Sequence, residues 1–162
     1  MKAASLTELK HELKTLTPAQ LVDLCLHLSK YKKENKELLT YLLFEADNEA
    51  AYVKNVKEMV TELFGDVNMS SIYLAKKTIR KILRITAKYI KYSGSRQTEA
   101  ELLLFFCKQL NHSGVPLHSS QTMMNLYQRQ IQKIEKAIAT MHEDLQYDYQ
   151  EDIKELKGHQ IK

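Results

Sequence analysis

Eight basic residues and no acidic residue stand between Ser70 and Gln97. They are Lys76, Lys77, Arg80, Lys81, Arg84, Lys88, Lys91 and Arg96. At about 100° per residue, the seven that fall in one helical stretch occupy an arc of roughly 140°. Apolar residues fill the opposite side, so we expect one helix that separates charge by face. A concentrated positive face attracts anions, and an aromatic residue beside it, such as Tyr73, can stack on a base.

Four interpretations of this basic face are open. In the first, acids flank it or water solvates it, because segment 34–66 carries eight acids against three lysines and segment 142–156 carries six acids against one lysine. In the second, it binds nucleic-acid phosphates, although no helix-turn-helix, zinc-finger or RNP pattern accompanies it. In the third, it binds an acidic protein. A membrane surface is disfavoured, because the apolar side of the helix is needed for the core.

Motifs for catalysis and for cofactor binding are missing from the sequence. It contains no Gly-x-Ser-x-Gly, no glycine-rich phosphate loop and no His-Glu-x-x-His. Cys107, His112 and His118 bracket one predicted loop and could share a zinc ion, with surface or loop-packing histidines as the alternative. We therefore expect a protein that is not an enzyme and that has no cofactor and no metal site.

Helical periodicity runs through the chain. It predicts helices over 6–15, 18–31, 36–46, 49–64, 71–92, 98–111, 120–146 and 149–157. Only four glycines and two prolines occur in 162 residues, and capping boxes starting at Ser5, Thr17 and Thr98 mark three helix starts. These features predict an all-α protein, a single domain over 1–162 with a frayed tail at 158–162. Its seven to eight antiparallel helices would form an irregular bundle or a short α–α superhelical array.

The predicted core takes apolar residues from nearly every helix. It comprises Leu9, Leu21, Leu24, Leu28, Leu42, Leu43, Val53, Val56, Val60, Ile72, Ile79, Ile82, Leu83, Leu103, Phe106, Ile131, Ile134 and Ile138. The two cysteines, Cys25 and Cys107, have apolar neighbours. We expect both to be buried, reduced thiols of a cytoplasmic protein, with a disulfide as the unsupported alternative.

Segment 120–146 carries a second regular pattern. Apolar residues recur there at alternating spacings of three and four over three heptads: Met124, Tyr127, Ile131, Ile134, Ile138, Met141 and Leu145. This spacing is typical of the central helix of a bundle, and the alternative is a seam that continues into a partner chain.

No targeting or membrane segment is evident. The first ten residues are polar and lack the apolar region of a secretory signal. The longest apolar run, 102–107, is far too short to cross a bilayer. We expect no membrane partner.

Two leucine-rich stretches, Leu6 to Leu13 and Leu21 to Lys36, lie in the N-terminal quarter of the chain. They resemble the start of an uncharacterised family of small all-helical bacterial proteins. In that family a short Leu/Lys/Glu helix precedes a helix that ends in a Lys- and Asn-rich turn, here Tyr31-Lys32-Lys33-Glu34-Asn35-Lys36. The resemblance implies an all-helical bacterial protein, and the family has no assigned activity to transfer to any residue.

Two functional hypotheses follow from the sequence. The first is a non-catalytic protein–protein interaction or scaffold module that self-associates or binds another protein, supported by the heptad pattern and by the lack of catalytic motifs. The alternative is a nucleic-acid-binding accessory protein that uses the basic face of the helix at 71–92.

Overall fold

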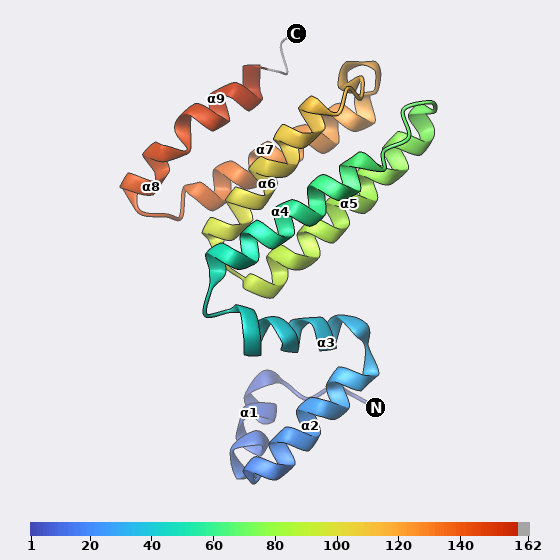
Figure 1. Cartoon of the computed structure of the whole chain (residues 1–162). Helices are drawn as coiled ribbons and strands as arrows, with labels where there is room; N and C mark the ends of the chain where they lie inside the picture. Colours follow the sequence, from blue (N-terminus) through green and yellow to red (C-terminus); the bar gives the residue numbers. More distant parts are fainter. Residues whose placement is uncertain (159–162) are drawn as a thin grey trace. The chain divides into compact units, whose positions relative to one another are not determined.

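The computed structural model describes residues 1–158, and every regular element in that range is helical (Figure 1). The predicted all-α fold is confirmed. Internal contacts divide the chain into two compact units, an N-terminal unit over 1–44 and a C-terminal unit over 45–162. A single domain over 1–162 stays a prediction. Of the tail expected at 158–162, Gly158 ends a helix and 159–162 lie outside the described residues.

The N-terminal unit contains three α-helices, α1 (Leu6–Thr15), α2 (Pro18–Tyr31) and α3 (Lys33–Thr40). A π-helical turn, η1 (Tyr41–Glu45), follows them across the unit boundary. The first two helices have the predicted bounds because their capping boxes form: the Ser5 hydroxyl accepts from the Glu8 N–H and the Thr17 hydroxyl from the Gln20 N–H. The third begins at Lys33, three residues before the predicted start at 36.

Core formation in the N-terminal unit was predicted wrongly. The helices α1, α2 and α3 bury no residue, and in 1–44 only Tyr41 is buried. Leu21 is half-buried, and the other core residues predicted here are exposed: Leu9, Leu24, Leu28, Leu42 and Leu43. Cys25, expected to be buried, is also exposed. The physical reason is size, because a segment of about 40 residues has too little interior to enclose a core of its own.

The C-terminal unit is an irregular bundle. Its α-helices are α4 (Glu49–Gly65), α5 (Ile72–Ser93), α6 (Arg96–His112), α7 (Gln121–Ile138), α8 (Glu143–Asp148) and α9 (Gln150–Gly158), with a short 3₁₀ helix, η2 (Leu117–Ser119), before α7. Helix α6 is central, since it contacts α4, α5, α7 and α9 (Figure 1). Three consecutive leucines, 102–104, are all buried on α6, together with Phe106 and Cys107.

The core prediction is largely confirmed in this unit. Buried as expected are Val53, Val56, Val60, Ile79, Ile82, Leu103, Phe106, Ile131, Ile134 and Ile138. The prediction is wrong for Ile72, which is 48% exposed, because the first residue of a helix has fewer packing neighbours than its middle. Leu83 is half-buried.

The continuous helix expected over 120–146 is also wrong. Helix α7 ends at Ile138, and α8 begins only at Glu143. Two side chains make local hydrogen bonds in the interruption: the Thr140 hydroxyl donates to the Ala137 carbonyl, and a ring nitrogen of His142 accepts from the Asp144 N–H as the N-cap of α8. Such bonds favour helix ends over helix interiors.

The turn between α5 and α6 is fixed by a glycine and by one carboxylate. Gly94 adopts φ +66°, which a residue with a side chain rarely tolerates, and its N–H donates to the Ile90 carbonyl at 2.9 Å. The Glu49 carboxylate accepts from the hydroxyls of Ser93 and Thr98. The N-cap of α6 is Ser95. The capping box predicted at Thr98 is wrong, because Thr98 lies inside the helix and is buried.

Two isoleucines of α5 provide a matched test of this core. Ile79 is fully buried and Ile72 is 48% exposed. Because truncation of a buried isoleucine removes transfer free energy and leaves a cavity, Ile79→Ala should lower the free energy of unfolding by about 2–5 kcal/mol. Ile72→Ala should change it by less than about 1 kcal/mol. Urea unfolding followed by circular dichroism measures both, and equal losses would contradict the packing described.

Candidate nucleic-acid interface

Helix α5 separates apolar from basic side chains along its 22 residues. The Ser71 hydroxyl caps its first turn by accepting from the Leu74 N–H. Its inward side is buried at Ala75, Ile79, Ile82 and Thr86. The Thr86 hydroxyl donates to the Ile82 carbonyl at 3.0 Å, so this buried polar group costs little. The predicted two-faced helix is confirmed.

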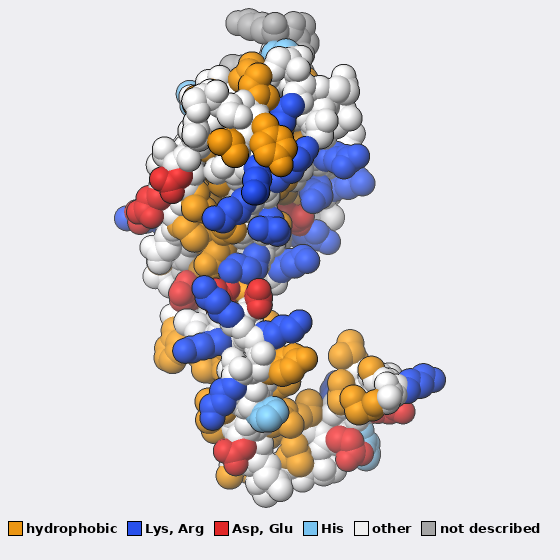
Figure 2. Space-filling view, turned by 90° about the vertical axis from the view of Figure 1, so that its right-hand side faces the viewer, with side chains coloured by type: hydrophobic (Ala, Val, Ile, Leu, Met, Phe, Trp, Pro, Cys, Tyr) orange, Lys and Arg blue, Asp and Glu red, His pale blue; other side chains and the backbone are white. Residues whose placement is uncertain are grey.

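Six cations of α5 make no ion pair with any residue of 1–158. They are Lys76, Lys77, Arg80, Lys81, Arg84 and Lys91, and we call them the α5 basic face. Two further cations predicted for this site are engaged. The Lys88 ammonium lies 4.9 Å from the ring centre of Tyr89 and 5.9 Å from that of Tyr92, and the Arg96 guanidinium pairs with Glu99 at 2.7 Å. Figure 2 shows Lys and Arg side chains gathered on one side of the C-terminal unit.

Some of the acids expected to flank this face pair with lysines outside it. Examples are Lys33–Glu37 at 3.7 Å, Lys54–Glu58 at 3.9 Å and Lys108–Asp152 at 2.5 Å. The acid-rich segments 34–66 and 142–156 form no ion pair with the α5 basic face within the part of the chain that the structure describes. The six cations are therefore not neutralised by these segments.

A groove of about 380 Å³ adds cations that the sequence reasoning missed. Arg80 of α5 lines it together with Arg129 and Lys133 of α7, and none of the three has an ion-pair partner among the described residues. Leu83 and Leu126 also line it and supply apolar surface. The spacing of four between Arg129 and Lys133 places them on one side of α7, which the sequence could have indicated.

Gln130 brings an unusual polar group to the same groove. Its side chain is 96% buried, since 4% is exposed, and its Nε2 donates to the Leu126 carbonyl at 3.0 Å. Its Oε1 has no hydrogen-bond partner among the described residues. This oxygen is itself buried and can only accept a hydrogen bond. The surface that the groove offers thus combines the cations with the apolar side chains of Leu83 and Leu126.

The residues predicted as an interaction seam are mostly core. Tyr127, Ile131, Ile134 and Ile138 are buried in the C-terminal unit. Met124, Met141 and Leu145 are half-buried, and the last two lie beyond the end of α7. The bundle interpretation of this pattern accounts for these positions, and a seam free for a partner chain has no continuous helix to carry it.

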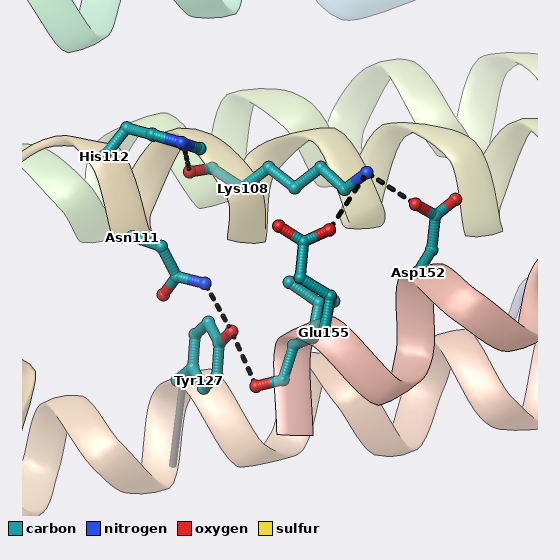
Figure 3. Close-up of polar contacts among 7 residues, drawn as sticks. Lys108, Asn111, His112, Tyr127, Asp152 and Glu155 are labelled. Carbon is teal, nitrogen blue, oxygen red and sulfur yellow. Dashed lines mark hydrogen bonds and ion pairs between the residues drawn. The ribbon is translucent and has the colours of Figure 1, made fainter. Parts of the chain in front are cut away.

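A second polar cluster joins α9 to α6 and α7 (Figure 3). The Lys108 ammonium lies 2.5 Å from Asp152 and 3.7 Å from Glu155. The Tyr127 hydroxyl donates to the Leu156 carbonyl at 3.1 Å and accepts from the Asn111 amide at 2.8 Å. These bonds run from two long helices to the short terminal one.

The pKa values of this cluster favour an anchoring role. The hydrogen bond to Asp152 raises the pKa of Lys108, and burial raises the pKa of Tyr127 to about 12. Both groups therefore keep their protons near neutral pH and serve as donors. They hold α9 in place by hydrogen bonds and ion pairs.

The described residues contain neither a metal-binding cluster nor a membrane-spanning helix. No three His, Cys, Asp or Glu side chains in 1–158 converge to hold a metal ion, so Cys107, His112 and His118 do not form such a group. Cys107 is buried and its pKa is raised to about 12 by desolvation, while a ring nitrogen of His112 lies 2.7 Å from the Lys108 carbonyl. None of the helices in this range has the length and apolarity needed to cross a bilayer.

Comparison with known proteins gives no match to a family model, to a curated protein or to a solved structure. The resemblance of 6–13 and 21–36 to an uncharacterised bacterial family stays a prediction.

The anchor at Tyr127 predicts a pH dependence of stability. The ordinary pKa of tyrosine is 10.0 and that of folded Tyr127 is about 12. Between these values the unfolded chain loses the proton first, so the free energy of unfolding should fall as the pH rises from about 10 to 12. Tyr127→Phe should cost about 1–2 kcal/mol at pH 7, because Asn111 and Leu156 lose a partner, and should make the alkaline fall shallower. Denaturant titrations at each pH measure both effects.

Tyr147→Phe is the control for this experiment. Tyr147 is 74% exposed on α8, so its replacement should change neither the stability at pH 7 nor the alkaline slope. A Tyr127→Phe variant that behaves like this control would contradict the anchoring role.

Proposed function

We propose that the C-terminal unit binds nucleic acid by its phosphates, using the α5 basic face. The observation that carries the proposal is the set of six α5 cations without an ion pair to a described residue. Such cations do not have to break an existing pair when a phosphate arrives. Release of counterions from the nucleic acid then favours binding.

The extent of the basic face favours nucleic acid over an acidic protein. Fifteen residues separate Lys76 from Lys91, which at 1.5 Å per residue is about 22 Å of helix. The phosphates of a nucleic-acid strand carry negative charge at regular intervals over such a length, whether the strand is single or part of a duplex. Acidic residues on a protein surface are spaced irregularly. Tyr73, 74% exposed near the start of α5, adds an aromatic surface for a base.

The groove between α5 and α7 favours an unpaired strand. Arg80, Arg129 and Lys133 would hold a phosphate there. The apolar surface of Leu83 and Leu126 would pack against a base. A base inside a duplex cannot enter a groove of this kind without leaving the stack.

A second candidate function is protein binding, the hypothesis based first on the heptad pattern. The buried seam no longer supports it, and its support is now the exposed apolar surface of the N-terminal unit. Self-association and a separate partner both fit that surface in general terms.

Neutralising part of the α5 basic face should weaken nucleic-acid binding. For six phosphates on a single strand, log K should fall with log salt at a slope of about −4, and Lys77→Gln with Lys81→Gln and Arg84→Gln should bring this to about −2. Fluorescence anisotropy of a labelled single-stranded oligonucleotide, repeated at several salt concentrations, measures the slopes.

The matched control removes three cations elsewhere: Lys10→Gln, Lys14→Gln and Lys54→Gln. These are exposed residues of α1 and α4. The net charge changes equally in both triple variants, so only the first should lose affinity. No binding by the native protein at low salt would reject the proposal, and so would an equal loss in the control.

The groove between α5 and α7 predicts a preference for single-stranded over duplex nucleic acid, which the α5 basic face alone does not predict. Arg129→Gln with Lys133→Gln should weaken single-stranded binding by about tenfold and duplex binding by less, because only an unpaired nucleotide can use the groove. Lys136→Gln with Lys154→Gln, two exposed lysines of α7 and α9, is the control. Equal effects on both substrates would show that α7 contributes charge without a nucleotide site.

A further inference from the structure

A groove of about 700 Å³ lies within the N-terminal unit, between α2 and the segment formed by α3 and η1. Its apolar lining is Leu26, Leu39, Leu43 and Phe44. Phe44 is 79% exposed and Leu43 62%, values far from those of residues that pack inside a protein. Apolar side chains concentrated in this way mark a binding surface.

Lysines surround this apolar surface. Lys30, Lys32, Lys33 and Lys36 all line the groove. Lys33 pairs with Glu37 at 3.7 Å, and the other three have no ion pair with a described residue. Orange apolar and blue basic side chains are neighbours on this unit in Figure 2. An occupant must therefore be apolar on one side and acidic beside it.

One side-chain hydrogen bond joins the two walls of the groove. The Asn35 amide donates to the Leu28 carbonyl at 2.8 Å, which fixes the turn between α2 and α3. The hydroxyls of Ser29 and Thr40 donate to carbonyls of their own helices, both at 2.8 Å. A groove whose walls are already ordered loses less conformational entropy when it binds.

We propose that this groove binds an acidic amphipathic helix of a partner protein. Apolar residues at spacings of three, four and seven on such a helix would lie on Leu26, Leu43 and Phe44. Glutamates or aspartates flanking that stripe would meet the free lysines. Charges around an apolar contact select the partner by sign and speed its association.

The chain's own helix α9, although acidic, does not fit this role. The acids of α9 are occupied in the C-terminal unit, where Asp152 and Glu155 pair with Lys108 and the Leu156 carbonyl accepts from Tyr127. A second copy of this chain would have to break these bonds before its α9 could bind in the groove. A helix from another protein carries no such cost.

The experiment uses the full chain and two synthetic helical peptides. One peptide has leucines at heptad positions a and d with glutamates beside them, and the other has lysines in place of the glutamates. Fluorescence anisotropy should show saturable binding of the glutamate peptide, with the lysine peptide at least tenfold weaker. Binding of both peptides alike would overturn the proposal, and so would binding of neither.

Two variants locate the site. Leu43→Ala with Phe44→Ala should lower the affinity for the glutamate peptide by about tenfold or more, because apolar anchor residues dominate the binding energy of such contacts. Lys30→Glu with Lys36→Glu should weaken it as well and should improve binding of the lysine peptide. All four residues are exposed, and circular dichroism checks that helicity is kept. Leu74→Ala with Tyr147→Ala, exposed residues of α5 and α8, should change nothing.

Other occupants give different results. Binding to vesicles of equal phosphatidylserine and phosphatidylcholine that is lost in the Leu43/Phe44 variant, without peptide binding, would assign the groove to a membrane. Dimerisation in sedimentation that is lost in the same variant would assign it to a second copy. The Lys77/Lys81/Arg84 variant should keep full peptide affinity, so failure of this inference is distinguishable from failure of nucleic-acid binding.

Discussion

Burial of the apolar side of α5 is the constraint on which the surface chemistry depends. Once Ile79 and Ile82 are enclosed, the helix cannot rotate, and the α5 basic face must point outward. Six like charges then stand together without acids against them. Water and salt screen their mutual repulsion, so the fold tolerates them. The position of the basic face thus follows from the packing of the core, and the proposed binding of nucleic acid rests on that packing.

The sequence predicted α5 and its charge separation well because one period governs both sets of side chains. It predicted the end of α7 poorly, since the local bonds of Thr140 and His142 outweigh a heptad pattern that continues beyond them. It also predicted burial poorly in the N-terminal unit. Periodicity shows which side of a helix is apolar, and it does not show whether a neighbour covers that side.

The candidate site was predicted only in part for a related reason. The cations of α5 are close in sequence, so a single helix reveals them. Arg129 and Lys133 join Arg80 only through the packing of helices that are almost fifty residues apart in the chain. Such a meeting of charges is a property of tertiary structure. The lysines around the groove of the N-terminal unit, in contrast, are local, and what the sequence hid was the exposed Leu43 and Phe44 beside them.

The attachment of α9 has a consequence for local dynamics. Leu156 is its one buried residue in 150–158, and it is otherwise held by polar contacts with Lys108, Tyr127 and Glu135 of α6 and α7. Helix α6, in contrast, buries residues along its whole length and touches four neighbours. The backbone amides of α9 should thus exchange with solvent deuterium through local detachment of that helix. Those of α6 should exchange only when the whole bundle unfolds.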